Sequence, residues 1–133
     1  MTIVNCTPHT INFNNGTDIG PCGKIARVVS EYTIVGCKIV HQCTGGIDDH
    51  EHAVYCGCPE QGNGWTVPSY SIEYGEVTDL PAPAVGAVFI VSSIVLAAAK
   101  AQGRTDCCAP ATGHHDCIRN DKGHIVSVPG LVF

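Results

Sequence analysis

The stretch AVFIVSSIVLAAAKAQGRTDCCAP, residues Ala87–Pro110, decides the fold. It opens with an unbroken apolar run over residues 87–91, rich in β-branched and aromatic side chains, as is typical of a strand buried on both faces. The hydroxyls of Ser92 and Ser93 can cap a helix over residues 94–102, which is rich in alanine. We therefore expect a buried strand followed by one main helix.

The same stretch continues past the helix into a second strand. Gly103 favours a left-handed exit from the helix, and residues 105–109 are typical of a short strand that Pro110 ends. A strand–helix–strand unit of this length fits a right-handed crossover between parallel strands. Arg104 and Asp106 would then lie at an edge of the sheet, so we expect the core in this unit and function near its rim.

A membrane span is the alternative for this region, because no residue from Leu80 to Ala99 is charged and such a run can cross a bilayer. Pro81 and Pro83 at one end, the serine pair in the middle and the lack of a flanking Lys/Arg cluster disfavour it. We expect no membrane partner.

Composition excludes several classes of protein. At 133 residues, the chain has the size of one domain. Hydrophobic residues make up 44% of the sequence and charged residues only 14%, a composition that excludes wholesale disorder. So few charges predict an apolar surface and hence a homo-oligomer. A net charge of −5 without any basic cluster argues against a nucleic-acid polymer as partner, although a small nucleotide needs only one or two arginines.

Outside the central unit, the chain predicts short strands separated by turns such as Asn14-Asn15-Gly16. The sum is a β-rich α+β single domain over residues 1–133, with residues 33–73 as an inserted β-hairpin. The expected strands cover residues 3–4, 10–13, 25–29, 33–40, 50–58, 70–77 and 124–128, and residues 59–68 are expected to form a loop.

Nine cysteines make an unusually high and odd count. The opening MTIVNCTPHT has no basic region, apolar core or cleavage site of a secretory signal. Without such a signal, reduced thiols and metal ligation are favoured over a disulfide framework.

Alternation along two antiparallel strands would gather thiols and imidazoles on one face of the insertion. If residues 33–43 pair with residues 50–58 around Gly46-Ile47, four of these groups can coordinate one structural Zn²⁺. Two more can form a second site or a disulfide. The four are His41, Cys43, His50 and His52, and the two are Cys37 and Cys56.

The alternative is a set of ordinary buried thiols and surface imidazoles, because His-x-His and Cys-x-Cys are weaker signals than paired Cys-x-x-Cys motifs. The metal site also depends on register, since a slip of one residue separates the ligands. His114-His115-Asp116-Cys117 likewise resembles a metal-binding run. Adjacent side chains on an extended backbone point apart, which favours a solvated loop there.

A second group of residues lies in loops and at the ends of elements, where binding residues concentrate. Its arginines suit bidentate contacts with phosphate or carboxylate, and its Thr-Gly pair offers a hydroxyl and an accessible N–H. The group consists of His9, Arg104, Asp106, Thr112, Gly113 and Arg119. The alternative, which the sequence leaves open, is a local Arg104–Asp106 ion pair and a turn-capping role for His9.

Four segments, taken together, resemble a family of small proteins encoded by phages and prophages. They are Val4–Ile11 (VNCTPHTI), Ile90–Asp106 with its Ser-helix-Gly-Arg-Thr-Asp pattern, Pro110–Gly113 (PATG) and Arg119–Val126 (RNDKGHIV). The resemblance covers roughly residues 1–32 and 74–133, which leaves 33–73 as an insertion. Aliphatic residues stand in the family where this chain has Cys6, Cys107 and Cys108, which implies that these thiols belong to the core.

Three observations together favour a non-enzymatic phage-type binding protein in the host cytoplasm: this resemblance, the lack of a recognisable catalytic set, and the arginines in loops that can bind an anion. It would sequester a nucleotide-derived defence signal or block a host protein, so the expected partner is a small anionic ligand or a host protein. A metal-dependent hydrolase acting on a nucleotide, using the insertion, is the second hypothesis. A minor virion component is the third.

Overall fold

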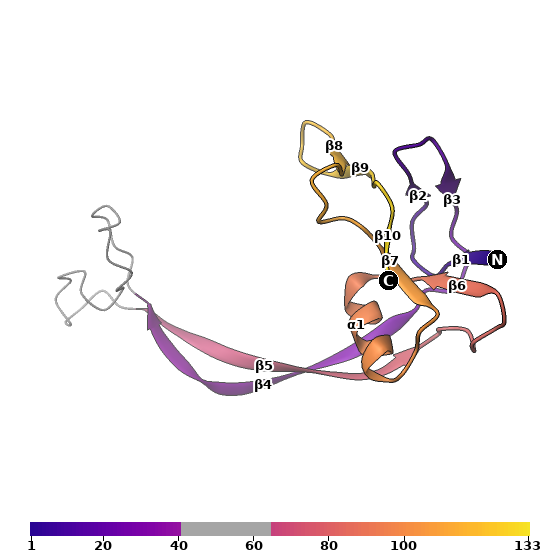
Figure 1. Cartoon of the computed structure of the whole chain (residues 1–133). Helices are drawn as coiled ribbons and strands as arrows, with labels where there is room; N and C mark the ends of the chain where they lie inside the picture. The colour runs from indigo at the N-terminus through magenta and orange to yellow at the C-terminus, as the bar shows by residue number, and fades with distance from the viewer. Residues whose placement is uncertain (41–64) are drawn as a thin grey trace. The chain divides into compact units, whose positions relative to one another are not determined.

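The structure is a computed structural model that describes residues 1–40 and 65–133 (Figure 1). The chain divides into two compact units. The first consists of Met1–Ser30 together with Tyr74–Phe133, and the second of Glu31–Glu73. The second unit covers the range that the sequence marks as an insertion. The expected α+β, strand-rich class with one helix and a β-hairpin is confirmed.

A four-stranded sheet forms the centre of the first unit, in the order β1-β6-β7-β10. β1 (Thr2–Asn5), β6 (Ala87–Ile90) and β7 (Cys107–Pro110) run parallel to one another, and β10 (Leu131–Val132) is antiparallel to β7. The parallel pairing of β6 with β7 confirms the predicted strand–helix–strand crossover. The edge strand β10 was not expected from the sequence.

The single helix among the described residues, α1 (Ser93–Ala101), begins and ends at the predicted signals. The Oγ of Ser92 accepts the N–H of Val95 at 3.4 Å, which satisfies one of the free donors of the first turn. Gly103 follows with φ = +83°, a conformation that side chains with a Cβ rarely adopt. In Figure 1, α1 lies beside the strands that it connects.

Both faces of β6 are covered, as its unbroken apolar sequence predicts. Phe89 packs on the α1 side together with Val95 and Cys107, whereas Ile90 packs on the other side with Cys108. The three thiols expected in the core are confirmed there, since Cys6, Cys107 and Cys108 are only 1%, 2% and 0% exposed.

Two short ribbons lie together in the first unit (Figure 1). One pairs β2 (Ile11–Asn12) with β3 (Asp18–Ile19), and the other pairs β8 (Ile118–Arg119) with β9 (Ile125–Ser127). A parallel bridge joins Phe13 to Val128, and the N–H of Asn14 donates to the carbonyl of Val128 at 2.9 Å. These contacts bring residues 7–12 close to residues 125–128.

The hairpin of the insertion pairs β4 (Arg27–Val40) with β5 (Trp65–Thr78), a pairing that the sequence did not predict. Residues 65–68, expected in a loop, are part of β5. Alternation shows that a segment is extended but does not identify its partner. Residues 41–64, with the expected turn at Gly46-Ile47 and strand 50–58, lie outside the described residues.

The uncharged run from Leu80 to Ala99 contains β6 and most of α1. Within the described residues, no helix combines the length and the apolar character that a membrane crossing requires.

Candidate ligand pocket at the carboxyl ends of the parallel strands

A cavity of about 430 Å³ opens where the three parallel strands end. The segments that follow β1, β6 and β7 form its walls, and the β9 region closes it. In sheets with parallel strands, ligands characteristically bind outside these carboxyl ends. The lining residues are Thr7, Pro8, His9, Thr10, Ile11, Asn12, Ser92, Ser93, Pro110, Thr112, Ile125, Val126, Ser127 and Val128.

The chemistry of this lining suits an anion. It includes the N-terminus of α1 at Ser92 and Ser93, where first-turn N–H groups have no partner within the helix and the helix dipole is positive. Hydroxyl side chains come from every strand end, and His9 contributes an imidazole. Of the described residues around the cavity, none is acidic. A phosphate would therefore meet donors and no opposing carboxylate.

Asn5 holds the wall that contains His9. Its side chain is 1% exposed and makes four hydrogen bonds. Nδ2 donates to the carbonyls of His9 at 2.8 Å and Ile19 at 2.9 Å, while Oδ1 accepts from the N–H of Thr7 at 2.9 Å and its hydroxyl at 2.6 Å. We assigned Asn5 no role from the sequence. The available signal was an amide residue at the end of the first expected strand, in an Asn-x-Thr segment.

Arg119 supports the wall opposite to it. Its Nη1 donates to the carbonyl of Gly123 at 2.9 Å, and its Nη2 donates to the carbonyl of Thr112 at 3.3 Å. The guanidinium thus links the turn after β8 to the loop after β7. Gly113, also a predicted ligand residue, follows in that loop and is exposed.

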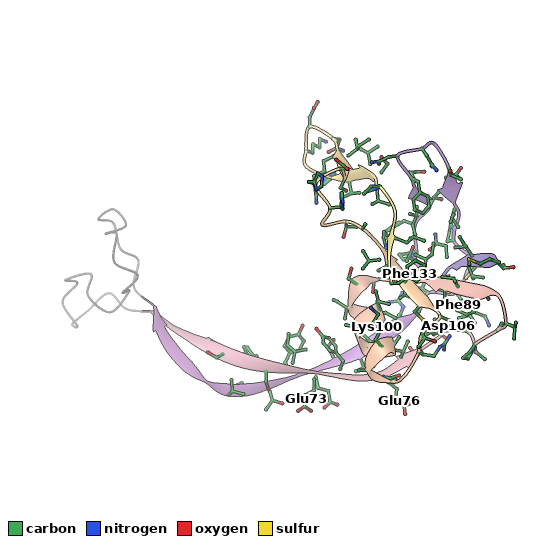
Figure 2. All side chains as sticks on the ribbon, viewed as in Figure 1. Glu73, Glu76, Phe89, Lys100, Asp106 and Phe133 are labelled. Atoms are coloured by element: carbon green, nitrogen blue, oxygen red, sulfur yellow. The ribbon has the colours of Figure 1, made fainter. Side chains whose placement is uncertain are left out.

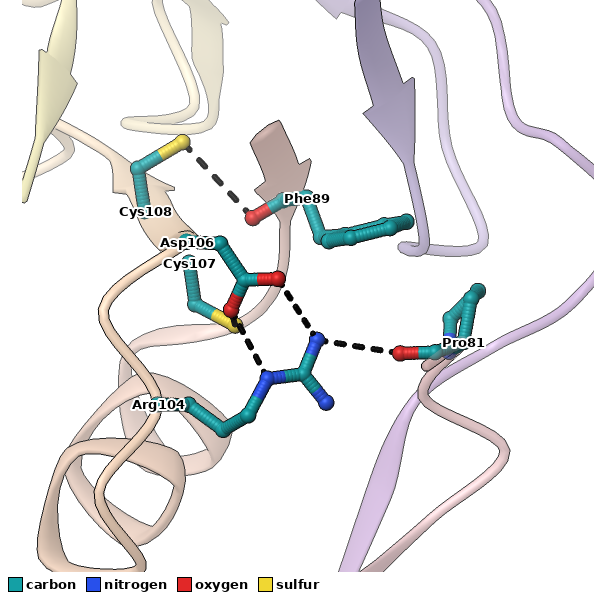
Figure 3. Close-up of polar contacts among 6 residues, drawn as sticks. All are labelled: Pro81, Phe89, Arg104, Asp106, Cys107 and Cys108. Atoms are coloured by element: carbon teal, nitrogen blue, oxygen red, sulfur yellow. Dashed lines mark hydrogen bonds and ion pairs between the residues drawn. The ribbon is translucent and has the colours of Figure 1, made fainter. Parts of the chain in front are cut away.

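Arg104 and Asp106 form the local ion pair that was the alternative to ligand binding (Figure 3). The guanidinium donates to both carboxylate oxygens at 2.7 and 2.9 Å, and Nη2 also donates to the carbonyl of Pro81 at 3.0 Å. Its carbon lies 5.7 Å from the centre of the Phe89 ring. The hydrogen bonds from Arg104 hold the pKa of Asp106 below its usual value, and Asp106 in turn raises the pKa of Arg104.

The structure does not bring the six predicted ligand residues together. His9 and Thr112 line the cavity, and Arg119 contacts Thr112 from behind. Arg104 and Asp106 precede β7 and therefore lie at the amino end of that strand, whereas the cavity lies at the carboxyl ends. Figure 2 shows Asp106 near Phe89 and Lys100 on the helix. The charged pair thus serves the helix–strand connection.

The loop at His114-His115-Asp116 brings three groups together that could hold a metal ion, their ligand atoms all lying within 4.8 Å of one another. All three residues are exposed, so a solvated loop is what the structure shows. The expectation that the two imidazoles point apart is wrong, because they stack with ring centres 4.2 Å apart. The backbone turns here and is not extended, with the Cys117 N–H donating to the His114 carbonyl at 3.0 Å.

The zinc site predicted in the insertion falls mainly on residues outside the described ranges, namely His41, Cys43, His50, His52 and Cys56. Cys37 lies in β4. That site stays a prediction.

Comparison of the chain with protein-family models, with curated proteins and with solved structures gives no match. The pocket therefore has to be interpreted from its own chemistry.

Proposed function

We propose that this protein binds a small anionic ligand of the nucleotide class, without converting it, in the pocket at the carboxyl ends of β1, β6 and β7. The observation that carries this proposal is the convergence of segments far apart in the sequence on one cavity that contains a helix N-terminus. Its volume of about 430 Å³ falls within the usual range for small-molecule sites, roughly 300–1,000 Å³.

The resemblance to phage-encoded proteins supports the same site. Its motif residues Thr7, His9, Ser92 and Thr112, with the Ile125–Val126 pair, all line the cavity. A binding role in the host cytoplasm, removing a nucleotide-derived defence signal from solution, agrees with a pocket that offers donors and apolar walls. Blocking of a host protein is the variant of this proposal in which the ligand is part of a macromolecule.

The described residues favour binding over catalysis. No cysteine or carboxylate lies among the described residues of the lining. Burial raises the pKa of the Cys108 thiol to about 11 and, with help from Cys22, that of Cys6 to about 12, so both thiols are protonated near neutral pH, and neither lines the pocket. A metal-dependent hydrolase built on the insertion remains the second hypothesis.

The first prediction tests binding and turnover together. Incubation with a panel of cyclic and ADP-ribose-type nucleotides, followed by desalting and heat denaturation, should release one class of nucleotide intact. Chemically altered products would show a hydrolase, and no retention of any nucleotide would contradict both hypotheses.

A charge variant localises the binding. Ser93→Asp introduces a residue type that is favoured in the first turn of a helix, so the fold should be kept, but it places a negative charge in the pocket. The affinity for the retained nucleotide should therefore fall at least about tenfold. Asn15→Asp makes the same change of charge in an exposed turn outside the lining and should leave affinity unchanged. Equal affinities for wild type and Ser93→Asp would place the ligand elsewhere.

A structural zinc ion in the insertion is a separate proposal, supported by the mixture of imidazole and thiolate ligands that zinc prefers. Protein purified without chelator or affinity metal should contain about one equivalent of zinc. His50→Ala/His52→Ala should lose it, whereas His114→Ala/His115→Ala should keep it. The reverse result would place the metal in the 114–116 loop, and wild-type protein with less than about a tenth of an equivalent would contradict a resident zinc ion.

Homo-oligomer formation also remains a proposal, and the surface that supports it lies in the second unit, not on α1. The alanines of α1 at positions 98 and 99 are buried in the protein's own core. In the second unit, Tyr32 and Tyr70 pack edge to face on one side of the hairpin, their ring centres 6.4 Å apart, and both are at least half exposed. Covering such aromatic surface favours association.

Light scattering at micromolar concentration should therefore show a dimer or a larger species. Tyr32→Ser/Tyr70→Ser should shift it toward monomer, whereas Thr33→Ser/Ser71→Thr, at alternate positions that face the other way, should not. A wild-type monomer would contradict the proposal.

A further inference from the structure

We propose that Cys6 and Cys22 form an oxidisable dithiol that closes to an intramolecular disulfide in the presence of a hydroperoxide. Their sulfur atoms lie 3.9 Å apart. Cys6 is 1% exposed, whereas Cys22 is exposed to solvent. The pair lies outside the lining of the ligand pocket, so this modification site does not depend on the proposed function.

The backbone already holds the two residues side by side. Asn5 and Pro21 form a parallel bridge, the Cys22 N–H donates to the Asn5 carbonyl at 2.8 Å, and the Ala26 N–H donates to the Cys6 carbonyl at 3.0 Å. One step further in this register, Cys6 lies next to Cys22. The spacing of paired strands, about 4.8 Å, falls inside the range of Cα separations that disulfides bridge, about 4.4–6.8 Å. Side-chain rotation can therefore close the bond while the backbone stays in place.

Accessibility selects this pair among the five thiols whose surroundings the structure describes. Of these five, Cys22 is exposed, Cys117 is half-buried, and Cys6, Cys107 and Cys108 are buried. Cys107 also contacts a carboxylate, its sulfur lying 3.7 Å from Oδ1 of Asp106. Burial, followed by this negative charge, raises the pKa of Cys107 and disfavours its thiolate. Of these five thiols, Cys22 is thus the one that a peroxide reaches most readily, and Cys6 is the thiol already in contact with it.

The chemistry needs one equivalent of hydrogen peroxide. The Cys22 thiolate attacks a peroxide oxygen and breaks the O–O bond, which leaves a sulfenic acid on Cys22 and releases hydroxide that takes up a proton to become water. The Cys6 sulfur then attacks the sulfenic sulfur, the S–O bond breaks, and the leaving hydroxide takes the Cys6 proton as a second water molecule. The two thiols lose two electrons, which the peroxide receives.

The bond would close a loop that contains one wall of the pocket, residues 7–12, and the β2–β3 ribbon. Closing a loop of this length in the unfolded chain stabilises the folded state, and we expect the midpoint of thermal unfolding to rise by roughly 10 °C.

Peptide mapping tests the proposal directly, because Cys6 and Cys22 are the two cysteines of the single tryptic peptide Met1–Lys24. The folded protein is treated with one to a few equivalents of hydrogen peroxide, denatured, alkylated and digested. The peptide should become two hydrogens lighter and carry no alkyl group, and treatment with a reductant before alkylation should restore two alkylated thiols.

Two variants separate this pair from the other cysteines. Cys22→Ser, at an exposed position, should fold normally, lose the lightened peptide and lose the rise in the unfolding midpoint. Cys117→Ser, which removes a thiol outside the pair, should retain both. Two alkylated thiols in peptide Met1–Lys24 after oxidation of the folded protein would overturn the proposal. So would a cross-link from this peptide to the one that contains Cys107.

Discussion

Replacing Asn5 with alanine is expected to lower the free energy of unfolding by about 3 kcal/mol and to abolish retention of the ligand. The side chain is buried at the end of β1, and its amide bonds to three different residues. The alanine variant leaves the Ile19 carbonyl without this donor and the Thr7 N–H without its acceptor. Unpaired buried groups of this kind cost about 1–3 kcal/mol each.

The loss of binding would follow from the same bonds. Asn5 holds the turn that presents Thr7 and His9 to the cavity, so without it this wall of the pocket loses its shape. Urea unfolding monitored by circular dichroism gives the stability, and the nucleotide retention assay gives the binding.

A second Asn-x-Thr segment in the chain provides the matched control. Asn15 accepts from the N–H of Thr17 at 3.0 Å and from its hydroxyl at 2.6 Å, the same local pattern as that of Asn5 with Thr7. Asn15 is exposed, however, so water can replace its bonds. Asn15→Ala should cost less than about 1 kcal/mol and leave binding intact. Equal losses for the two variants would show that the local turn, and not the buried network, accounts for the stability.

The strand–helix–strand unit could be predicted closely because its signals are local. The predicted strand 87–91 and helix 94–102 correspond to Ala87–Ile90 and Ser93–Ala101. Ser92 caps the helix through a hydrogen bond within one turn, and Gly103 ends it through its own backbone conformation. Neither effect requires knowledge of distant residues.

Strand partners could not be predicted in the same way. β4 pairs with β5 across the whole insertion, and β1 lies beside β6 although more than eighty residues separate them in the sequence. Alternation reports burial on one face and says nothing about which strand supplies the neighbouring backbone. β10 was missed because a two-residue strand contains too little pattern to recognise.

The candidate site was predicted only in part. The residue types indicated anion binding, but they could not show whether the ligand would bind at the amino or the carboxyl ends of the strands. Thr112 follows β7 and lines the pocket, whereas Arg104 precedes β7 and does not. Positive charge drew attention to Arg104, yet in the structure its carboxylate partner is only two residues away. The rule that ligands bind at carboxyl ends of parallel strands would have selected Thr7 and Ser92 as well.

Replacing Asp106 with asparagine is expected to lower the free energy of unfolding by about 2 kcal/mol at pH 7, because it removes a bidentate, charge-assisted pair. The two side chains are only 19% and 18% exposed, so solvent screens the pair weakly. The variant leaves the Arg104 guanidinium over Phe89 with one neutral acceptor in place of two charged oxygens. Asp121→Asn, at an exposed turn, makes the same substitution and should cost less than about 0.5 kcal/mol.

The pH dependence gives the sharper test of this pair. The folded state lowers the pKa of Asp106 through its hydrogen bonds with Arg104, so the unfolded state binds this proton more readily than the folded state. The contribution is therefore complete above the unfolded value of about 3.9, and it is lost as the pH falls through the lower folded value. Urea unfolding at pH 7, 5 and 3 should show a difference between wild type and Asp106→Asn that is constant from pH 7 to 5 and smaller at pH 3. Arg104→Lys, which keeps the charge but not the planar fork, should lose part of the stability and retain the same pH trend. No difference at pH 7 would mean that Pro81 and Phe89 hold Arg104 without help from the carboxylate. A difference that stays the same at pH 3 would mean that the stability does not come from the negative charge of Asp106.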